Sequence, residues 1–254
     1  CALPIYVYRK WRNTARYILG NTYDYDPNHP VAYKDLEEID KWALTRLNKL
    51  IKDCTKDYDE FKFSNAFHDI NQFCVVDMSS FYLDIIKDRL YTEKADSLSR
   101  RAAQTTMYCV LDALVKILTP MISFTAEEIW KAMKHIDSEN LKSPMLADYP
   151  VENKEWNNKV LSEKWQKIIE VKDVVAKQLE IAAPGEDYKF LKENEELVKQ
   201  VLIVSELCVD EDETAKELKV EVAHADGEKC ERCWKYDVHT EDGLCPRCRE
   251  VLSH

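Results

Sequence analysis

Four cysteines near the end of the sequence have the pairing and spacing of a metal site. Two residues separate Cys230 from Cys233, two separate Cys245 from Cys248, and eleven separate the pairs in EKCERCWKYDVHTEDGLCPRC. Four thiolates complete a tetrahedral zinc site, and backbone amides of each tight Cys-x-x-Cys turn can donate hydrogen bonds to the sulfurs. Because no coordination position is left open, we expect one structural Zn²⁺ that folds this tail.

Other interpretations of these cysteines remain open at the level of sequence. They could form two disulfides, act as a redox dithiol or bind iron, and His239 could replace one of them as a ligand. The other five of the nine cysteines are single, at Cys1, Cys54, Cys74, Cys109 and Cys208. An odd total without a second paired framework fits a reducing compartment, so we expect a cytoplasmic protein.

A cationic segment near the N-terminus has the chemistry to contact phosphates. Residues 6–17 contain four Lys and Arg residues and no acidic residue. Helical spacing places Trp11 on an apolar face and most of the polar side chains on the opposite one. The candidate phosphate-binding residues are Arg9, Lys10, Arg12, Asn13 and Arg16. The alternative is an ordinary solvated helix face.

Cations and one aromatic residue also flank the cysteine quartet. Lys229, Arg232, Trp234 and Arg247 could meet an unstacked RNA base and its phosphates, although Trp234 could instead cover the metal-binding turn. The formal net charge of −11 opposes nucleic-acid binding as a global average. Acid is concentrated in segments such as 206–217, so local basic surfaces remain.

We identify no catalytic residue and no membrane segment in this sequence. Four histidines, His68, His135, His224 and His254, are isolated, and there is no glycine-rich phosphate loop. No apolar run approaches the roughly 20 residues that span a bilayer. A hydrophobic fraction of 45% and abundant aromatic residues favour a folded, soluble chain.

The periodicity of apolar residues predicts a mainly α protein whose helices position these groups. The expected helices cover residues 6–20, 35–51, 64–91, 95–118, 125–133 and 156–179. Asp35 with Glu38, and Thr125 with Glu128, have the spacing of N-terminal caps. Valine-rich segments at 201–209 and 219–225 predict two strands before the cysteines.

These elements divide the chain into four expected parts. The first is an antiparallel helical bundle over residues 1–136, and a proline-containing connector follows at 137–155. A small α+β junction domain should cover 156–227. The zinc-binding tail, a ribbon-like pair of knuckles, should cover 228–254.

Three stretches together resemble isoleucyl-tRNA synthetases of the bacterial type. They are YRKWRNTARYILGNTYDYDP, LTPMISFTAEEIW and GEKCERCWKYD with CPRC, in the same order as in that family. The resemblance implies the helical anticodon-binding domain of class I synthetases, with residues 9–16 as its basic opening helix. It also implies that the four paired cysteines are the family's zinc ligands.

In that family the enzyme couples isoleucine to its tRNA with ATP, on a Rossmann-type catalytic domain that carries an editing domain. The HIGH-like and KMSKS-like signatures of that part do not occur in this sequence, so ATP is expected only on the catalytic domain. The expected partners are isoleucine tRNA and the catalytic and editing domains of the same enzyme. We expect a monomer that binds neither DNA nor membranes.

The resemblance is weakest after Ala183, where the chain continues with PGEDYKFLKENEEL. The family usually has a basic, glycine-containing stretch and a strand there. Two other functions remain to be distinguished from tRNA recognition. One is a zinc-containing helical module that binds proteins but no tRNA, and the other is an enzyme that uses Cys230 or Cys233 as a reactive thiol.

Overall fold

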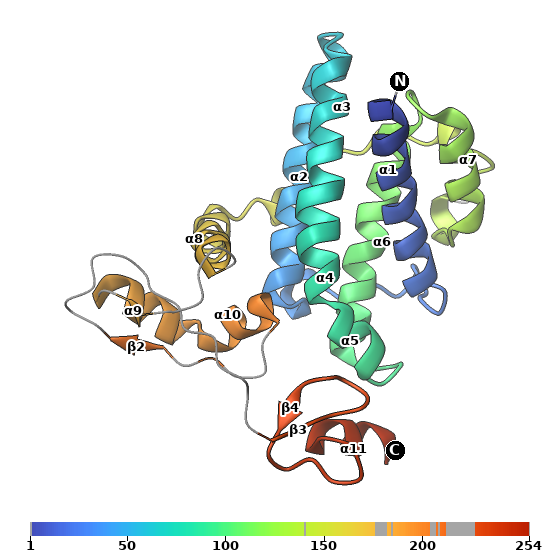
Figure 1. The fold of residues 1–254 in the computed structure, drawn as a ribbon. Helices are drawn as coiled ribbons and strands as arrows, with labels where there is room; N and C mark the ends of the chain where they lie inside the picture. Colours follow the sequence, from blue (N-terminus) through green and yellow to red (C-terminus); the bar gives the residue numbers. More distant parts are fainter. Residues whose placement is uncertain are drawn as a thin grey trace. The chain divides into compact units, whose positions relative to one another are not determined.

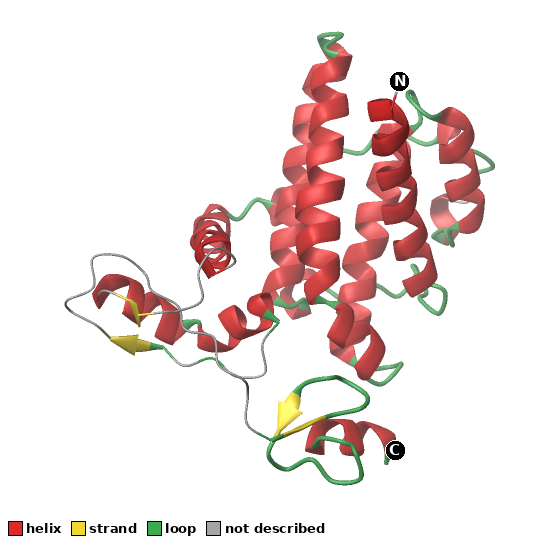
Figure 2. Ribbon diagram, viewed as in Figure 1, coloured by secondary structure: helices red, strands yellow, loops and turns green. Residues whose placement is uncertain are grey.

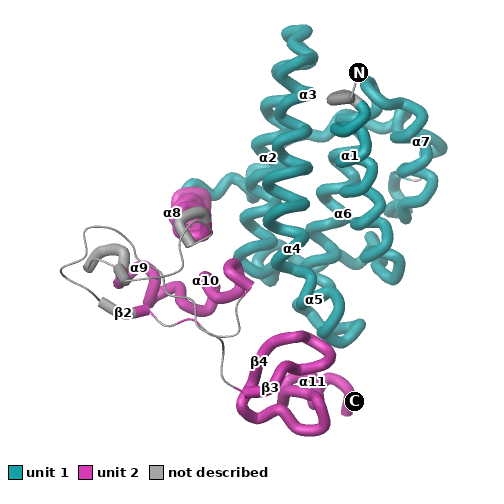
Figure 3. Tube along the Cα trace, in the orientation of Figure 1, with its two compact units in different colours: residues 1–159 teal, residues 160–254 magenta. Residues whose placement is uncertain are grey.

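The computed structural model is mainly helical, as the sequence predicts, with two small two-stranded sheets (Figures 1 and 2). Its described residues are 2–139, 141–175, 182–183, 185–203, 207, 209–211 and 227–253. The chain divides into two compact units, residues 1–159 and 160–254 (Figure 3). The residue boundaries of the four parts expected from the sequence stay a prediction.

The first helix, α1 (Ala2–Asn21), has the two faces that its sequence predicts. Its apolar face is buried against the bundle, at Val7, Trp11, Ala15 and Ile18. Thr14 lies on the same side and its hydroxyl contacts that of Ser79 (3.1 Å). Burial of this apolar face therefore determines which side of α1 faces solvent.

The cap predicted for the second helix is wrong. Asp35 lies in a short 3₁₀ turn, η1 (Tyr33–Asp35), and the helix α2 runs from Glu38 to Asp59. Glu37 is the N-cap, in a reciprocal capping box with Asp40. Asp40 also accepts hydrogen bonds from the guanidinium of Arg89 (2.8 and 3.1 Å), so a buried ion pair contributes to this choice of helix start.

The predicted helix over 64–91 is present but is not uniform. It consists of α3 (Phe63–Gln72), the π-helix η2 (Phe73–Tyr82), α4 (Leu83–Ile85) and α5 (Lys87–Thr92). In the π-helical stretch Asp77 accepts from Arg46 of α2 (3.0 Å), and Ser79 contacts Thr14 of α1. The wider turn thus coincides with polar contacts to two neighbouring helices.

The next two helices are α6 (Leu98–Leu118) and α7 (Ser123–Ala132). The side chain of Ser97 caps α6 by accepting from the backbone N–H of Arg100 (3.2 Å). The capping box predicted at Thr125 is wrong, because α7 starts two residues earlier with no side-chain cap. The Thr125 hydroxyl instead contacts the hydroxyl of Tyr8 on α1 (3.0 Å).

These helices form the predicted antiparallel bundle, in which α1, α2, α3 with η2, and α6 lie side by side (Figure 1). Its centre is built from side chains with no more than 1% exposure, including Ile18, Leu47, Ile70, Met107 and Trp130. Burial of such large apolar side chains contributes about 1.5–3 kcal/mol each, which makes this core the main stabilising element of the first unit.

The segment after α7 stays attached to the bundle through hydrogen bonds. It contains three short 3₁₀ turns, η3 (Asp137–Glu139), η4 (Pro144–Leu146) and η5 (Lys154–Trp156). Asn48 of α2 donates to Asn157 (2.7 Å) and accepts from the backbone of Asn153 (2.8 Å). The residues predicted as a connector therefore belong to the first unit.

The second unit begins with the predicted helix α8 (Lys159–Val175), which starts three residues after Trp156. Two further helices, α9 (Gly185–Glu193) and α10 (Glu195–Leu202), follow. Leu191, Val198 and Val209 form its small apolar core. The strand β1 (Ala182–Ala183) pairs in parallel with β2 (Asp210–Glu211).

The first of the two strands predicted before the cysteines, over residues 201–209, is not found in the described residues of that segment. Val201 belongs to α10, whose Val198 packs with Leu191 of α9 in the small apolar core. Residues 219–225 lie outside the described residues. A short antiparallel pair, β3 (Glu228–Lys229) and β4 (Tyr236–Asp237), frames the first cysteine pair instead.

Candidate metal centre and cationic helix face

The first cysteine pair lies in the turn that joins β3 to β4. The backbone N–H of Cys230 donates to the carbonyl of Lys235 (2.9 Å), and the N–H of Trp234 donates to the carbonyl of Cys230 (2.9 Å). Trp234 has a left-handed φ of 65°, a conformation that non-glycine residues seldom adopt. The turn therefore directs both thiols inward at the cost of local backbone strain.

The second pair is placed by a short helix, α11 (Pro246–Leu252). Cys245 is its N-cap residue, Pro246 occupies the first turn, and Cys248 lies on the helix. Gly243 precedes the pair with a φ of 74°, and its carbonyl accepts from the N–H of Glu231 in the first turn (2.8 Å). This hydrogen bond joins the two knuckles into one structure.

All four thiols meet at one point. Their Sγ atoms lie within 4.8 Å of one another, and those of Cys233 and Cys245 are 3.7 Å apart. Sulfurs bound to one tetrahedral zinc at about 2.3 Å would be separated by about 3.8 Å. Among the described residues this is the one group with the composition and spacing to hold a metal ion.

The cysteines differ in how their surroundings affect ionisation. Burial opposes a charge on Cys230, but hydrogen bonds from the backbone N–H groups of Cys233, Cys245 and Arg232 outweigh it and lower the pKa of Cys230 to about 6. Burial is the largest cause of the raised pKa values of Cys233 and Cys248. Metal binding to this cluster must therefore release protons.

The other candidates around the quartet have different surroundings. His239 is exposed and does not belong to the thiol cluster. Arg232 and Arg247 are half-buried. Trp234 is 70% exposed, and the Nζ of Lys229 lies 5.0 Å from its ring centroid. The indole Nε1 donates to the carbonyl of Glu231 in the metal-binding turn (3.2 Å), so Trp234 packs on this turn while most of its ring surface stays exposed.

The cationic face of α1 is in solvent, as helical spacing predicts. Arg9, Arg12, Asn13 and Arg16 are exposed, whereas Lys10 is half-buried with its Nζ 5.2 Å from the ring centroid of Tyr6. None of the three arginines forms an ion pair with a described carboxylate. They form a strip of unneutralised positive charge over two turns of helix.

Other arginines of the bundle are neutralised within the fold. Arg89 pairs with Asp40, Arg100 and Arg101 pair with Asp24, and Arg46 pairs with Asp77. These contacts join separate parts of the bundle, so their guanidinium groups are structural. Although the net charge of the chain is negative, its arginines are therefore of two kinds: those paired with carboxylates inside the fold and the unpaired ones on α1.

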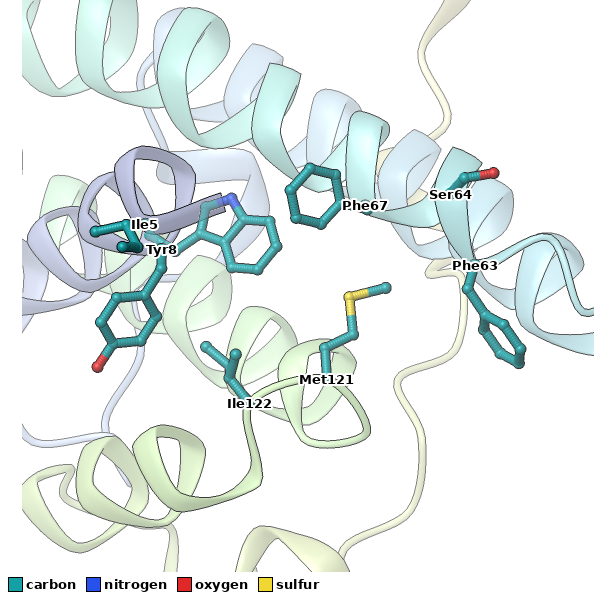
Figure 4. A pocket seen from close by; sticks show the side chains of 8 residues that line it. Ile5, Tyr8, Phe63, Ser64, Phe67, Met121 and Ile122 are labelled. Carbon is teal, nitrogen blue, oxygen red and sulfur yellow. The ribbon is translucent and has the colours of Figure 1, made fainter. Parts of the chain in front are cut away.

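The cationic helix face belongs to the first unit, and the thiol cluster belongs to the second. One feature of the bundle is not visible in the sequence: Ile5, Phe63 and Met121 line one apolar groove (Figure 4). These residues come from different elements, so no local pattern could have brought them together.

A helical bundle with an unpaired cationic helix, followed by a compact four-thiol tail, is an architecture suited to holding RNA. The chain belongs to the family described as "Anticodon-binding domain of tRNA ligase", whose model matches residues 40–192. Helix α1 and the thiol cluster lie outside that match.

Relatives extend the similarity to nearly the whole chain. It is 48% identical over 271 residues to an isoleucine–tRNA ligase of Caldicellulosiruptor saccharolyticus and 45% identical over 280 residues to one of Caldanaerobacter subterraneus. These alignments cover 97% of this chain and 29% and 30% of the relatives. An isoleucine–tRNA ligase of Carboxydothermus hydrogenoformans is 43% identical over 276 residues, covering 96% of this chain and 29% of the relative. The chain therefore spans under a third of the length of these proteins and matches their C-terminal part.

The alignments are longer than the chain itself. The one with the C. saccharolyticus protein has 271 positions against 254 residues here, so that relative has residues with no counterpart in this chain. Within the described residues, no helix is long and apolar enough to cross a membrane.

Proposed function

We propose that this chain recognises the anticodon region of isoleucine tRNA, as the C-terminal part of a ligase that joins isoleucine to that tRNA with ATP. The observation that carries the proposal is the strip of unpaired arginines on α1, in a chain whose family binds anticodons. Lys and Arg side chains that neutralise phosphates provide most of the affinity of such interfaces, and exposed cations without carboxylate partners are free to do so.

The bound metal in this proposal is zinc. Its ligands are Cys230, Cys233, Cys245 and Cys248, whose thiols have the number and mutual distance that a closed tetrahedral site needs. Zinc bound there supplies folding energy and not Lewis-acid chemistry, because four thiolates leave no position for a substrate.

The tail contributes to RNA binding chiefly through Trp234. Its exposed indole offers a stacking surface for an unpaired base, and Lys229 beside it offers a cation for the adjoining phosphate. Arg232 and Arg247 are the weaker candidates, since both are half-buried. Lys10 and Asn13 complete the contact set on α1.

The chain acts on the reaction by binding alone. We assign it no catalytic residue, and place ATP and the chemistry in the catalytic domain of the same enzyme, with editing in a further domain. Binding energy obtained far from the reacting atoms can be used to position the acceptor end of the tRNA and so raise the rate of the chemical step. We place the protein in the cytoplasm, as a monomer that binds neither DNA nor membranes.

A filter-binding titration tests this proposal. Isoleucine tRNA and a non-cognate tRNA are compared at two salt concentrations with the zinc-loaded chain and with an Arg9→Gln, Arg12→Gln, Arg16→Gln variant. The variant should bind at least tenfold more weakly, and the slope of log K against log salt should fall by about 2–3, because three phosphate contacts are lost.

The control carries Lys34→Gln, Lys52→Gln and Lys142→Gln. It loses the same net charge from exposed positions elsewhere in the first unit. If both variants lose affinity equally, the effect is one of total charge and the assignment to α1 is wrong. A zinc-loaded chain that binds no tRNA at all would favour the protein-interaction module.

A further inference from the structure

A small acidic pocket is lined by residues of α2 and α3, two helices that lie side by side in the first unit (Figure 1). Its volume is about 310 Å³, roughly ten times the share of liquid volume that one water molecule takes. The lining residues are Asp53, Lys56, Asp57, Asn65, His68 and Asp69. Three of them carry a carboxylate and one carries an ammonium group, so the pocket has the size and the charge to take a small organic cation.

The carboxylate of Asp57 is the unusual member of this lining. Asp57 is only 8% exposed, yet its side chain forms no ion pair or hydrogen bond with any described residue. Lys62, whose charge acts on Asp57, forms its own ion pair with Glu60. Lys56 is exposed, and neighbouring residues of a helix point in different directions. A buried charge without a partner is unfavourable, so a cation that reaches Asp57 stabilises the fold.

The position of Asp57 in its helix makes the unpaired charge still less favourable. Asp57 lies in the last turn of α2, where carbonyl groups without helical partners give the end of the helix a partial negative charge. A carboxylate is disfavoured there and a cation is favoured. A neutral amide would suit the free chain better at this position, so the carboxylate points to a ligand.

Two further carboxylates converge on the same place. Burial and the charges of all three carboxylates in the lining raise the pKa of the Cys54 thiol to about 12, so the three lie close to one buried group. Asp53 is paired with Lys49 within α2, whereas Asp69 of α3 has no ion pair with a described cation. Each of the two helices therefore contributes one unpaired carboxylate to the pocket.

The turn between α2 and α3 fixes the shape of the pocket before any ligand binds. Phe61, at a φ of 57°, closes the end of α2 by donating its N–H to the carbonyl of Tyr58 (3.1 Å). The N–H of Lys62 donates to the carbonyl of Asp57 itself (2.7 Å). Because Lys62 directly precedes α3, this hydrogen bond holds Asp57 beside the start of α3. A site that is already shaped has a lower entropy cost of binding.

We propose that this pocket binds a small linear diamine, with one ammonium group between Asp57 and Asp69. An ammonium group has three N–H donors, and the two carboxylates and the side-chain oxygen of Asn65 can accept them. Asp53 lies on the same helix face as Asp57, about 6 Å along the axis, so the second ammonium group also meets a carboxylate.

Other small ligands fit the pocket less well. Among the described residues only the four thiols have the mutual spacing of metal ligands, so these carboxylates do not form a site for a bare metal ion. An anion would meet two unpaired carboxylates. The inference depends neither on the tRNA contacts proposed above nor on zinc, so it can be tested without tRNA.

The test is a calorimetric titration of the zinc-loaded chain with 1,4-diaminobutane at constant ionic strength. We expect one diamine per chain, and at least tenfold weaker binding of butylamine, which lacks the second ammonium group. Asp57→Asn and Asp69→Asn should each weaken diamine binding at least tenfold. At a hundred times its Kd the diamine should raise the melting temperature of the bundle by about 5–10 °C. Without diamine, Asp57→Asn should itself raise the melting temperature, because it removes an unpaired buried charge.

The matched control is Asp59→Asn, which removes the same charge from the same last turn of α2. Asp59 is exposed and lies outside the lining, so this variant should bind the diamine as the native chain does. Equal loss of affinity in Asp57→Asn and Asp59→Asn would show an effect of total charge and overturn the proposal. No binding of the diamine by the native chain would overturn it too. Equal stabilisation by Mg²⁺ or by butylamine would show that the pocket does not select a diamine.

Discussion

Arg89 and Arg12 take two different roles in this molecule, although the sequence presents both simply as cations. The side chain of Arg89 is 6% exposed and donates to Asp40 and Ser99, so it joins α5 to α2 and α6. Arg12 is exposed and has no described carboxylate partner. Pairing, and not residue type, therefore identifies which cations are available to a polyanion.

Trp234 allows stability and binding to be separated at a single position. Its left-handed φ costs a non-glycine residue about 1 kcal/mol, a penalty that glycine does not have. We expect Trp234→Gly to be more stable than Trp234→Ala by about that amount. Both should weaken tRNA binding by about 1–3 kcal/mol, because both remove the stacking ring.

Thermal unfolding and filter binding on the two zinc-loaded variants check this prediction. Wild-type affinity in both would show that the indole does not contact RNA. If Trp234→Ala keeps the wild-type affinity and Trp234→Gly does not, the backbone conformation at this position, and not the ring, controls binding.

At the scale of elements, Asp24 connects the chain after α1 to the start of α6. Burial acts to raise its pKa, but hydrogen bonds from Arg100 and Gln104 and the charges of Arg100 and Arg101 outweigh it and lower the pKa to about 2. Since the folded pKa lies below the ordinary value of 3.8, this contact stabilises the fold above about pH 4. The stabilisation is lost as the pH falls through about 2.

We therefore expect Asp24→Asn to lower the free energy of unfolding at pH 7 by about 1–2 kcal/mol. The variant should also show less change in stability between pH 4 and pH 2 than the native chain. Urea unfolding at several pH values measures both quantities. Asp148→Asn, at an exposed position, is the control. If both variants lose the same free energy of unfolding, the ion pair of Asp24 is not the cause.

The sequence predicted the elements better than their ends. The apolar repeat of α1 correctly gave its buried face, since a residue in every turn, at a spacing of three or four residues, meets the same core. The caps at Asp35 and Thr125 failed because tertiary contacts decided them: Asp40 is held by Arg89, and Thr125 faces Tyr8. Val201 was taken for a strand residue because valine favours strands, but it lies in α10, the helix whose Val198 packs against Leu191 of α9.

Within the candidate sites, the sequence predicted those groups whose residues are close together along the chain. The cysteine quartet and the strip on α1 are local patterns whose spacing is visible in the sequence. The groove is not, since Ile5, Phe63 and Met121 come from separate helices and loops. The left-handed conformations of Trp234 and Phe61 were also hidden, because neither residue type signals that backbone region.

At the scale of the whole molecule, the two units depend on different sources of stability. The first unit has a large apolar core that includes fully buried side chains such as Trp130 and Ile70. In the tail of the second unit the buried cluster consists of Cys230, Cys245 and Cys248, and Cys233 and Leu244 are the residues packed against it in the described part of the chain. Such a small cluster cannot offset the conformational entropy of the tail without a bound ion.

Removal of the metal should therefore unfold the tail and leave the bundle intact. We expect a chelator, or Cys248→Ser, to abolish hydrogen-exchange protection in residues 228–252, while the melting temperature of the bundle stays unchanged. Elemental analysis should find one zinc per chain before chelation and none after it. Readdition of zinc should restore protection in the chelated chain but not in the variant.

Protection that persists in the metal-free tail would show that the thiol cluster is stable by itself. Loss of the bundle on chelation would show that the two units fold as one, contrary to the separate cores that support this prediction.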